Sequence, residues 1–327
     1  MFFFFFSQSE EWKNFREKVT NQLKYKANKN LYHYTSPEGL IGILGANKLW
    51  FTEASCLNDE SEGKYLYSLI QDCIENNMSF DIDFVEEVRR RIIENKNTVN
   101  DSKIDIADEG SEQAYAEEKS KYFICSFSLD KDALPLWNYY TKTPTSIGYN
   151  ISFSSSKLNK SVERELKSDF TNRYFYKVIY DEKVQNSIIM EALEIGNRLW
   201  HKYGDNIYRG DLIFWLKEFF EHIKFGFKHP AFESEKEVRM ILRMSSVKFE
   251  ELIVHNSETE YNEIKIRPIQ GVFVPYVEMN FEKTAMNGLM VSPTVKDEMA
   301  VESLNLLLKK YSFNDCTIEK STVPLKY

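Results

Sequence analysis

The sequence of 327 residues lacks several features that would place it in a specialised class. Its four cysteines are scattered without paired spacing, which argues against a zinc site or a disulfide framework. No run approaches the ~18 to 20 apolar residues that a membrane helix needs. The phenylalanines at positions 2–6 have no basic region before them and give way to Ser7, so we expect neither a leader nor an anchor. These absences predict a cytoplasmic protein with no membrane partner.

Positive charge is also in deficit, because the formal net charge is -8 at pH 7. This balance opposes nonspecific adhesion to nucleic acid, whose affinity depends on phosphate neutralisation, although it leaves a local basic groove open. Neither a Gly/Pro/Ser linker nor a repeat divides the chain. The 24 Phe and 19 Tyr indicate a packed protein rather than a disordered one. We expect an N-terminal helix within residues 1–30 that packs on a single domain formed by residues 31–327.

The stretch 31–51 is the most informative, and its pattern predicts strand, helix, strand. Ser36 is a good N-cap, Pro37 suits the first helical position, and the helix is expected to end at Gly45. His33 therefore lies on a short strand just before a helix N-terminus. The unpaired amides and the dipole at such an end suit an anionic ligand.

The remaining pattern mixes helices with short strands. Helices are expected at 10–25, 84–93, 182–227 and 297–311, and further strands at 122–128, 147–153, 174–180, 264–266, 272–274 and 317–320. Residues 97–118 are polar and acidic and are expected to be an insertion. This mixture predicts an α+β fold with a mainly antiparallel sheet, flanking helices and helical insertions.

A second informative stretch is 228–242, which begins Lys-His-Pro and ends in an alternating pattern. Val238, Met240 and Leu242 would form the apolar face of a half-buried strand. The opposite face would then carry the polar side chains of Glu235, Glu237 and Arg239 together.

The ordered motifs resemble a widespread bacterial family known mainly as a domain of unknown function. They are Tyr-His-Tyr-Thr-Ser at 32–36, Leu-Asn-Asp at 57–59, Cys-Ser-Phe-Ser at 125–128, Trp137 with Tyr140, and Lys-His-Pro at 228–230 leading to Glu235, Glu237 and Arg239. The resemblance runs from about residue 31 to the C-terminus.

More remotely, the first strand, its helix and the following Leu-Trp strand look like the opening of ADP-ribosyltransferases, especially the DNA-modifying toxin branch. The resemblance implies a split sheet with NAD as substrate, no metal, and Glu237 as the catalytic residue. It implies a nicotinamide and ribose site built from His33, Tyr34, Thr35, Ser36, Ser126, Ser128, Trp137 and Tyr140. The Glu235-x-Glu237 pair looks like the double-glutamate signature of the arginine-modifying branch, so the branch and the stacking aromatic stay open.

The chemistry of NAD cleavage requires a fixed carboxylate and residues that bind the acceptor. Loss of nicotinamide develops positive charge on the ribose, which a fixed carboxylate such as Glu237 stabilises. Glu235 would orient the incoming nucleophile. The loop residues Lys228, His229 and Phe232, together with Arg239, would contact a macromolecular acceptor, RNA, DNA or protein. By analogy the chain would act as a toxin or a phage-defence effector, with an antitoxin or regulatory partner.

Simpler interpretations and two other function classes remain. A lone His on a strand is most often structural, charged residues on one strand face most often form ion pairs, and Trp137 and Tyr140 suit a core. A metal-dependent nuclease or hydrolase would use His33, Asp59 and the glutamates, although a compact ligand motif is missing. A noncatalytic module would bind a nucleotide or a protein and leave NAD intact.

Overall fold

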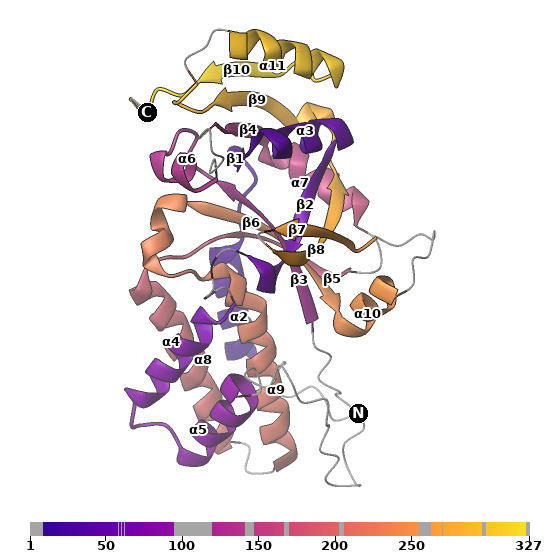
Figure 1. Cartoon of the computed structure of the whole chain (residues 1–327). Coiled ribbons are helices and arrows are strands. Elements are labelled where there is room, and N and C mark those ends of the chain that lie inside the picture. Colours follow the sequence, from indigo (N-terminus) through magenta and orange to yellow (C-terminus); the bar gives the residue numbers. More distant parts are fainter. Residues whose placement is uncertain are drawn as a thin grey trace. The chain divides into compact units, whose positions relative to one another are not determined.

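Figure 1 shows the structure of the chain, which is a computed structural model. It describes residues 9–57, 59, 61, 63–94, 120–140, 147–166, 170–202, 206–254, 263–269, 271–295 and 299–324. The insertion expected at 97–118 and Asn58 lie outside the described residues. The chain divides into two compact units: unit 1 comprises Met1–Lys24, Asp59–Glu117 and Val178–Pro230, and unit 2 comprises Tyr25–Asn58, Glu118–Lys177 and Ala231–Tyr327.

Unit 1 is helical in its described part. It contains α2 (Glu10–Leu23), α4 (Tyr65–Glu75), α5 (Ile82–Val88), α8 (Glu182–Lys202) and α9 (Asn206–Ile223). The first helix forms because its apolar residues recur every three or four positions, and all four of them, Trp12, Phe15, Val19 and Leu23, are buried. The helices expected at 10–25 and within 182–227 are therefore confirmed. Among the described residues, no helix combines the length and the apolar character that crossing a membrane requires.

Unit 2 is built on one sheet, in which ten strands are described. Its strands are β1 (Asn30–Thr35), β2 (Lys48–Glu53), β3 (Ser120–Ser128), β4 (Tyr149–Ser154), β5 (Phe170–Lys177), β6 (Glu237–Ser245), β7 (Lys265–Ile269), β8 (Val272–Asn280), β9 (Met286–Val291) and β10 (Thr317–Lys320). The order is β10-β9-β4-β1-β3-β2-β8-β7, and β6 joins β3 to β5. Every described pair except β9 with β10 is antiparallel. The expected α+β class with a mainly antiparallel sheet is confirmed.

One face of this sheet carries the large core of unit 2. Four helices supply apolar side chains to it: α3 (Pro37–Ala46), α7 (Ser155–Glu165), α10 (Ser246–Val254) and α11 (Met299–Lys310). From the sheet, Val238, Met240 and Leu242 of β6 point into the same core, as their alternation predicts. Leu31 and Phe127 also belong to it, which fixes the core side of β1 and β3.

A smaller cluster lies on the opposite face. Helix α6 (Leu134–Tyr140) brings Leu136 and Trp137 onto Tyr34 of β1 and Met290 of β9. This second face otherwise carries many polar side chains, and we refer to it as the polar face. It is the face that carries Glu237 and Arg239.

Candidate functional site

The sheet has a gap along one edge of β3. Strand β6 pairs with the whole of β3 from Ser120 to Ser128, which occupies the other edge. On the gap edge, β1 pairs at Ser128 through Tyr32, whereas β2 pairs only at Phe123 and Ile124. In this register neither β1 nor β2 pairs with positions 125–127. We call this opening between the two strands the β3 gap.

The ring of His33 occupies the β3 gap. Its Nδ1 lies 3.0 Å from the main-chain oxygen of Ser126. A carbonyl oxygen can only accept, so Nδ1 carries the proton and Nε2 of the neutral ring keeps its lone pair. Burial lowers the pKa of His33, the hydrogen bond to Ser126 opposes this, and the positive charge of Arg267 lowers it further. The histidine is thus held neutral with one nitrogen able to accept a hydrogen bond.

Arg267 is a site residue that the sequence pattern did not reveal. Its Nη2 donates to the Thr52 hydroxyl over 2.9 Å, and its guanidinium lies 4.7 Å from the Trp50 ring centre and 5.4 Å from that of Tyr276. Its Nε is buried and has no hydrogen-bond partner among the described residues. The strand was expected to end at 266, whereas β7 continues to Ile269. The useful signal was the basic residue at every second position, Lys265 and Arg267, which marks one strand face.

Glu237 and Arg239 form a buried ion pair at the start of β6. Arg239 donates from Nε and Nη2 to the two carboxylate oxygens of Glu237, each over 2.8 Å. The side chains are deeply enclosed, because Glu237 is 5% exposed and Arg239 only 1%. Such a two-point bond fixes the orientation of the carboxylate as well as its charge. The expectation that these two residues project from one strand face is confirmed.

Glu235 does not belong to that strand, contrary to the expected alternation. It ends a 3-10 helix, Pro230–Glu235, and Lys236 between the two glutamates has a left-handed φ of 45°. This conformation breaks the alternation that would put residues 235 and 237 on the same face. The main-chain oxygen of Glu235 accepts a 2.7 Å hydrogen bond from the Ser128 hydroxyl, which fixes the turn.

The strand register decides which predicted residues share a face. Ser128 is opposite both Tyr32 and Glu237, so these three side chains lie on the polar face. Ser126 is opposite Arg239 and lies on that face too. His33 follows Tyr32 and is directed to the other side, next to Phe127, with ring centres 5.6 Å apart. His33 and Glu237 therefore approach β3 from opposite faces and from opposite edges.

The start of α3 has its first amides engaged. The Ser36 hydroxyl caps the helix by accepting from the Gly39 amide over 3.1 Å, and Pro37 has no N–H. Hydrogen bonds from its own amide and from Ser36 lower the pKa of Glu38. The Glu38 carboxylate therefore also accepts hydrogen bonds at the N-terminus of α3. Thr35 packs against Gly39. The predicted cap is confirmed, and an anion here would compete with Ser36 and Glu38.

The aromatic residues expected to bind NAD have structural roles where they are described. The Tyr34 hydroxyl donates to the Asp130 carbonyl over 3.0 Å and accepts from the Ala133 amide over 2.9 Å. Trp137 is 1% exposed, and its Nε1 donates to Asp132 over 2.8 Å. Both rings therefore build the small core beneath α6. The side chain of Tyr140 lies outside the described part of the chain.

The expected acceptor loop is divided between the two units. Lys228 and His229 end unit 1, and Phe232 lies in the 3-10 helix of unit 2. Lys228 is buried, and its carbonyl accepts from Gln185 over 2.9 Å. His229 is exposed and meets the Tyr65 ring edge-on at 5.6 Å. The enclosed Lys228 thus does not present the open cation that we expected there.

One family model matches the middle of the chain. Residues 136–240 match the model of the family described as "Protein of unknown function (DUF2971)". The expected resemblance to a domain of unknown function is confirmed over that range, which runs from α6 into β6. No curated protein and no solved structure matches the chain. Within the described residues no group of three or more His, Cys, Asp or Glu side chains is arranged to hold a metal ion.

Proposed function

We propose that this protein is an ADP-ribosyltransferase that cleaves NAD and transfers ADP-ribose to a macromolecular acceptor. One observation carries the proposal. The three strands that hold the histidine, the serines and the glutamate are neighbours in the order β1-β3-β6, with His33 bonded to Ser126 and Glu237 opposite Ser128. These are the positions that the sequence resemblance selects, although nothing in a sequence requires three distant segments to become adjacent strands.

In this proposal Glu237 supplies the charge that the reaction needs. The bond between nicotinamide and C1′ of the ribose breaks, nicotinamide leaves with the bonding electrons, and positive charge develops on the ribose. A carboxylate held in a water-poor site stabilises that charge more strongly than a mobile one, because it needs no reorganisation. The bidentate bond from Arg239 supports this role by fixing both oxygens of Glu237.

Arg267 would hold another part of NAD. The sheet separates His33 from Glu237, so in this proposal His33 supports β3 through Ser126 and does not contact the ribose that Glu237 faces. Arg267 suits the pyrophosphate, because a guanidinium binds phosphate oxygens in a planar two-point fashion and its Nε still lacks a partner among the described residues. Trp50 and Tyr276, whose ring centres are 4.8 Å apart, both lie beside the guanidinium and stabilise its charge.

The acceptor in this proposal is RNA, DNA or protein. The protein would act as a toxin or a phage-defence effector, and an antitoxin or regulatory partner would inhibit it. This part rests on the resemblance to toxin-like transferases. Phe232, half-buried before the Glu235 turn, is the ring that we assign to the acceptor.

Labelled NAD tests the function. The full-length protein is incubated with NAD labelled in the adenylate and with a cell lysate, and separate portions are then treated with nuclease or protease. The proposal predicts label in macromolecules that one of the two treatments releases. A protein that binds NAD yet neither consumes it nor transfers label is a noncatalytic module, and that result would overturn the proposal.

A further inference from the structure

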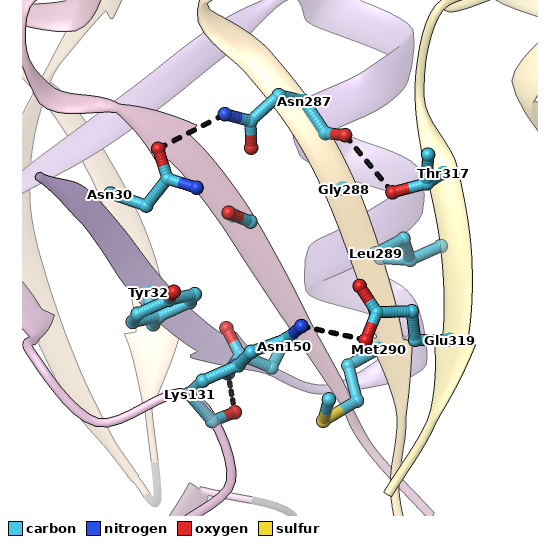
Figure 2. A pocket seen from close by; sticks show the side chains of 11 residues that line it. Asn30, Tyr32, Lys131, Asn150, Asn287, Gly288, Leu289, Met290, Thr317 and Glu319 are labelled. Carbon is cyan, nitrogen blue, oxygen red and sulfur yellow. Dashed lines mark hydrogen bonds and ion pairs between the residues drawn. The ribbon is translucent and has the colours of Figure 1, made fainter.

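A cavity of about 270 Å³ lies on the polar face of unit 2, and neither Glu237 nor His33 lines it. Four neighbouring strands, β1, β4, β9 and β10, supply most of its lining (Figure 2). This volume is near the lower end of the range for ligand sites, so the cavity suits one ring system rather than a dinucleotide. No step of the proposed NAD chemistry uses it.

The strands are shaped to leave this space open. A Cβ atom at Gly288 would lie 3.3 Å from both the Ser152 Cβ and the Thr317 hydroxyl oxygen. A side chain at this position would therefore crowd its neighbours and fill part of the cavity. The pairing of β4 with β9 shifts register beside Ser152, which leaves Asn287 without a partner on β4. Asn287 turns to the rim, where its amide donates to Asn30 over 3.1 Å. The bulge and the glycine together form a recess in this part of the sheet.

Asn150 gives the cavity an unused hydrogen-bond acceptor. Its side chain is 1% exposed, and its Nδ2 donates to the Lys131 carbonyl over 2.6 Å. Because that carbonyl can only accept, the amide orientation is fixed and Oδ1 points away from it. This Oδ1 is buried without a hydrogen-bond partner among the described residues. A buried acceptor of this kind costs free energy until an N–H or O–H reaches it.

The charge of the cavity favours a neutral ligand. Its two charged lining residues, Lys131 and Glu319, neutralise each other through a 2.6 Å ion pair at one end (Figure 2). Tyr32 supplies a half-buried ring at the side. The remaining lining consists of amides, hydroxyls, Gly288 and the apolar residues Leu289 and Met290. A planar ring could pack on Tyr32 and donate to Asn150, whereas a phosphate would find no unpaired cation in the described lining.

We propose that this cavity binds one neutral, planar heterocycle of nucleobase size that donates an amino or amide N–H to Asn150. The inference is independent of the proposed ADP-ribosyltransferase activity, because it rests on the cavity residues alone. It predicts that the protein distinguishes ligands by a single N–H group, since a ligand without that group leaves the Asn150 oxygen unpaired.

Two matched ligand pairs test the proposal on the full-length protein. Adenosine is compared with purine riboside, which lacks the amino group, and nicotinamide with methyl nicotinate, which lacks the amide N–H. Isothermal titration calorimetry or saturation-transfer NMR measures each dissociation constant. We expect at least one of the N–H ligands to bind, and its partner to bind about 10-fold or more weakly.

Two variants on β10 locate the site. Thr317 is exposed at the mouth, so Thr317→Phe fills the cavity from an edge strand without disturbing the core, and it should weaken binding about 10-fold or more. Lys320→Phe is the matched control, because Lys320 is exposed on the same strand and does not line the cavity. Asn150→Ala, where it folds, should abolish the preference for the N–H ligand.

Three outcomes would overturn the proposal. These are no binding by either N–H ligand at millimolar concentration, equal affinities within both pairs, or binding that Thr317→Phe leaves unchanged. A crystal structure of the soaked protein with only ordered water on Asn150 would also contradict it.

Discussion

Ser128 stands directly opposite Glu237 in the antiparallel pairing of β3 with β6. Its hydroxyl donates to the main-chain oxygen of Glu235 and accepts from the amide of Asp130 over 2.9 Å. One buried serine therefore holds the turn before β6 and the loop after β3. The position of the Glu237 carboxylate depends on that connection.

Glu237→Gln should reduce stability as well as activity. It removes the negative charge that Arg239 bonds at two points in a buried site, and breaking a buried ion pair costs about 3–5 kcal/mol. Urea unfolding measures the loss. The double variant Glu237→Gln with Arg239→Gln should recover part of it, because neither partner is then charged. A single variant as stable as the wild type would refute the buried pair.

His33 should make the protein less stable in mild acid. Its pKa is lowered in the folded state, so as the pH falls below the ordinary histidine value of about 6.5 the unfolded chain takes up the proton first. The stability that neutral His33 provides is fully present above that pH and declines below it, by at most about 1.4 kcal/mol per pH unit. Urea midpoints from pH 7.5 to 5.5 measure the decline. His33→Gln should show a smaller decline, and equal slopes would contradict this account.

Gly39 should tolerate a methyl group only after Thr35 is shortened. A Cβ at position 39 would lie 2.1 Å from the Thr35 hydroxyl oxygen, which is a clash. Gly39→Ala should therefore destabilise the wild type. In a Thr35→Ala background the same change should be neutral or stabilising by up to about 1 kcal/mol, because alanine favours a helix interior over glycine. Additive effects of the two substitutions, measured by thermal unfolding, would show that the clash is relieved in another way.

Asp132 should hold the C-terminal segment in a pH-dependent manner. Burial alone would raise its pKa, but hydrogen bonds from Ser321, Trp137 and Thr322 hold the pKa below its ordinary value. The stabilisation is present above the unfolded pKa of about 3.9 and is lost as the pH falls through the folded value. Asp132→Asn should weaken this dependence and speed proteolysis at residues 321–324. Unchanged cleavage would contradict the role assigned to Asp132.

Local patterns predicted much of the fold. The Ser36 cap, the alternation along β6 and the spacing in α2 depend on neighbouring residues, and each is confirmed. Strand β10 occupies the expected residues 317–320. By contrast, strand β9 and helix α7 were not foreseen. Strand β9 is a short apolar stretch, and Leu158 and Val162 are the buried apolar residues of the mostly polar helix α7. Local residue propensity indicates where a helix or strand forms along the chain. Pairing between distant strands determines which elements become its neighbours.

The site was less predictable for the same reason. The face that a side chain occupies depends on strand register, so the separation of His33 from Glu237 by the sheet could not be read from spacing. Lys236 has a left-handed backbone conformation, which places Glu235 outside the strand. The sequence has no glycine or asparagine at this position that would indicate such a conformation. Arg267 and Asn150 acquire their importance from cation–π contacts and burial, which only the assembled sheet creates.

Nicotinamide release from NAD measures the proposed cleavage. Purified wild-type protein should release nicotinamide, and Glu237→Gln should release it about 100-fold more slowly at a temperature where its circular dichroism shows a folded protein. Glu282→Gln is the matched control, because it makes the same chemical change in an exposed ion pair, and it should keep the wild-type rate. Equal rates in the wild type and Glu237→Gln, or no release above the buffer rate by the wild type with or without lysate, would contradict the account.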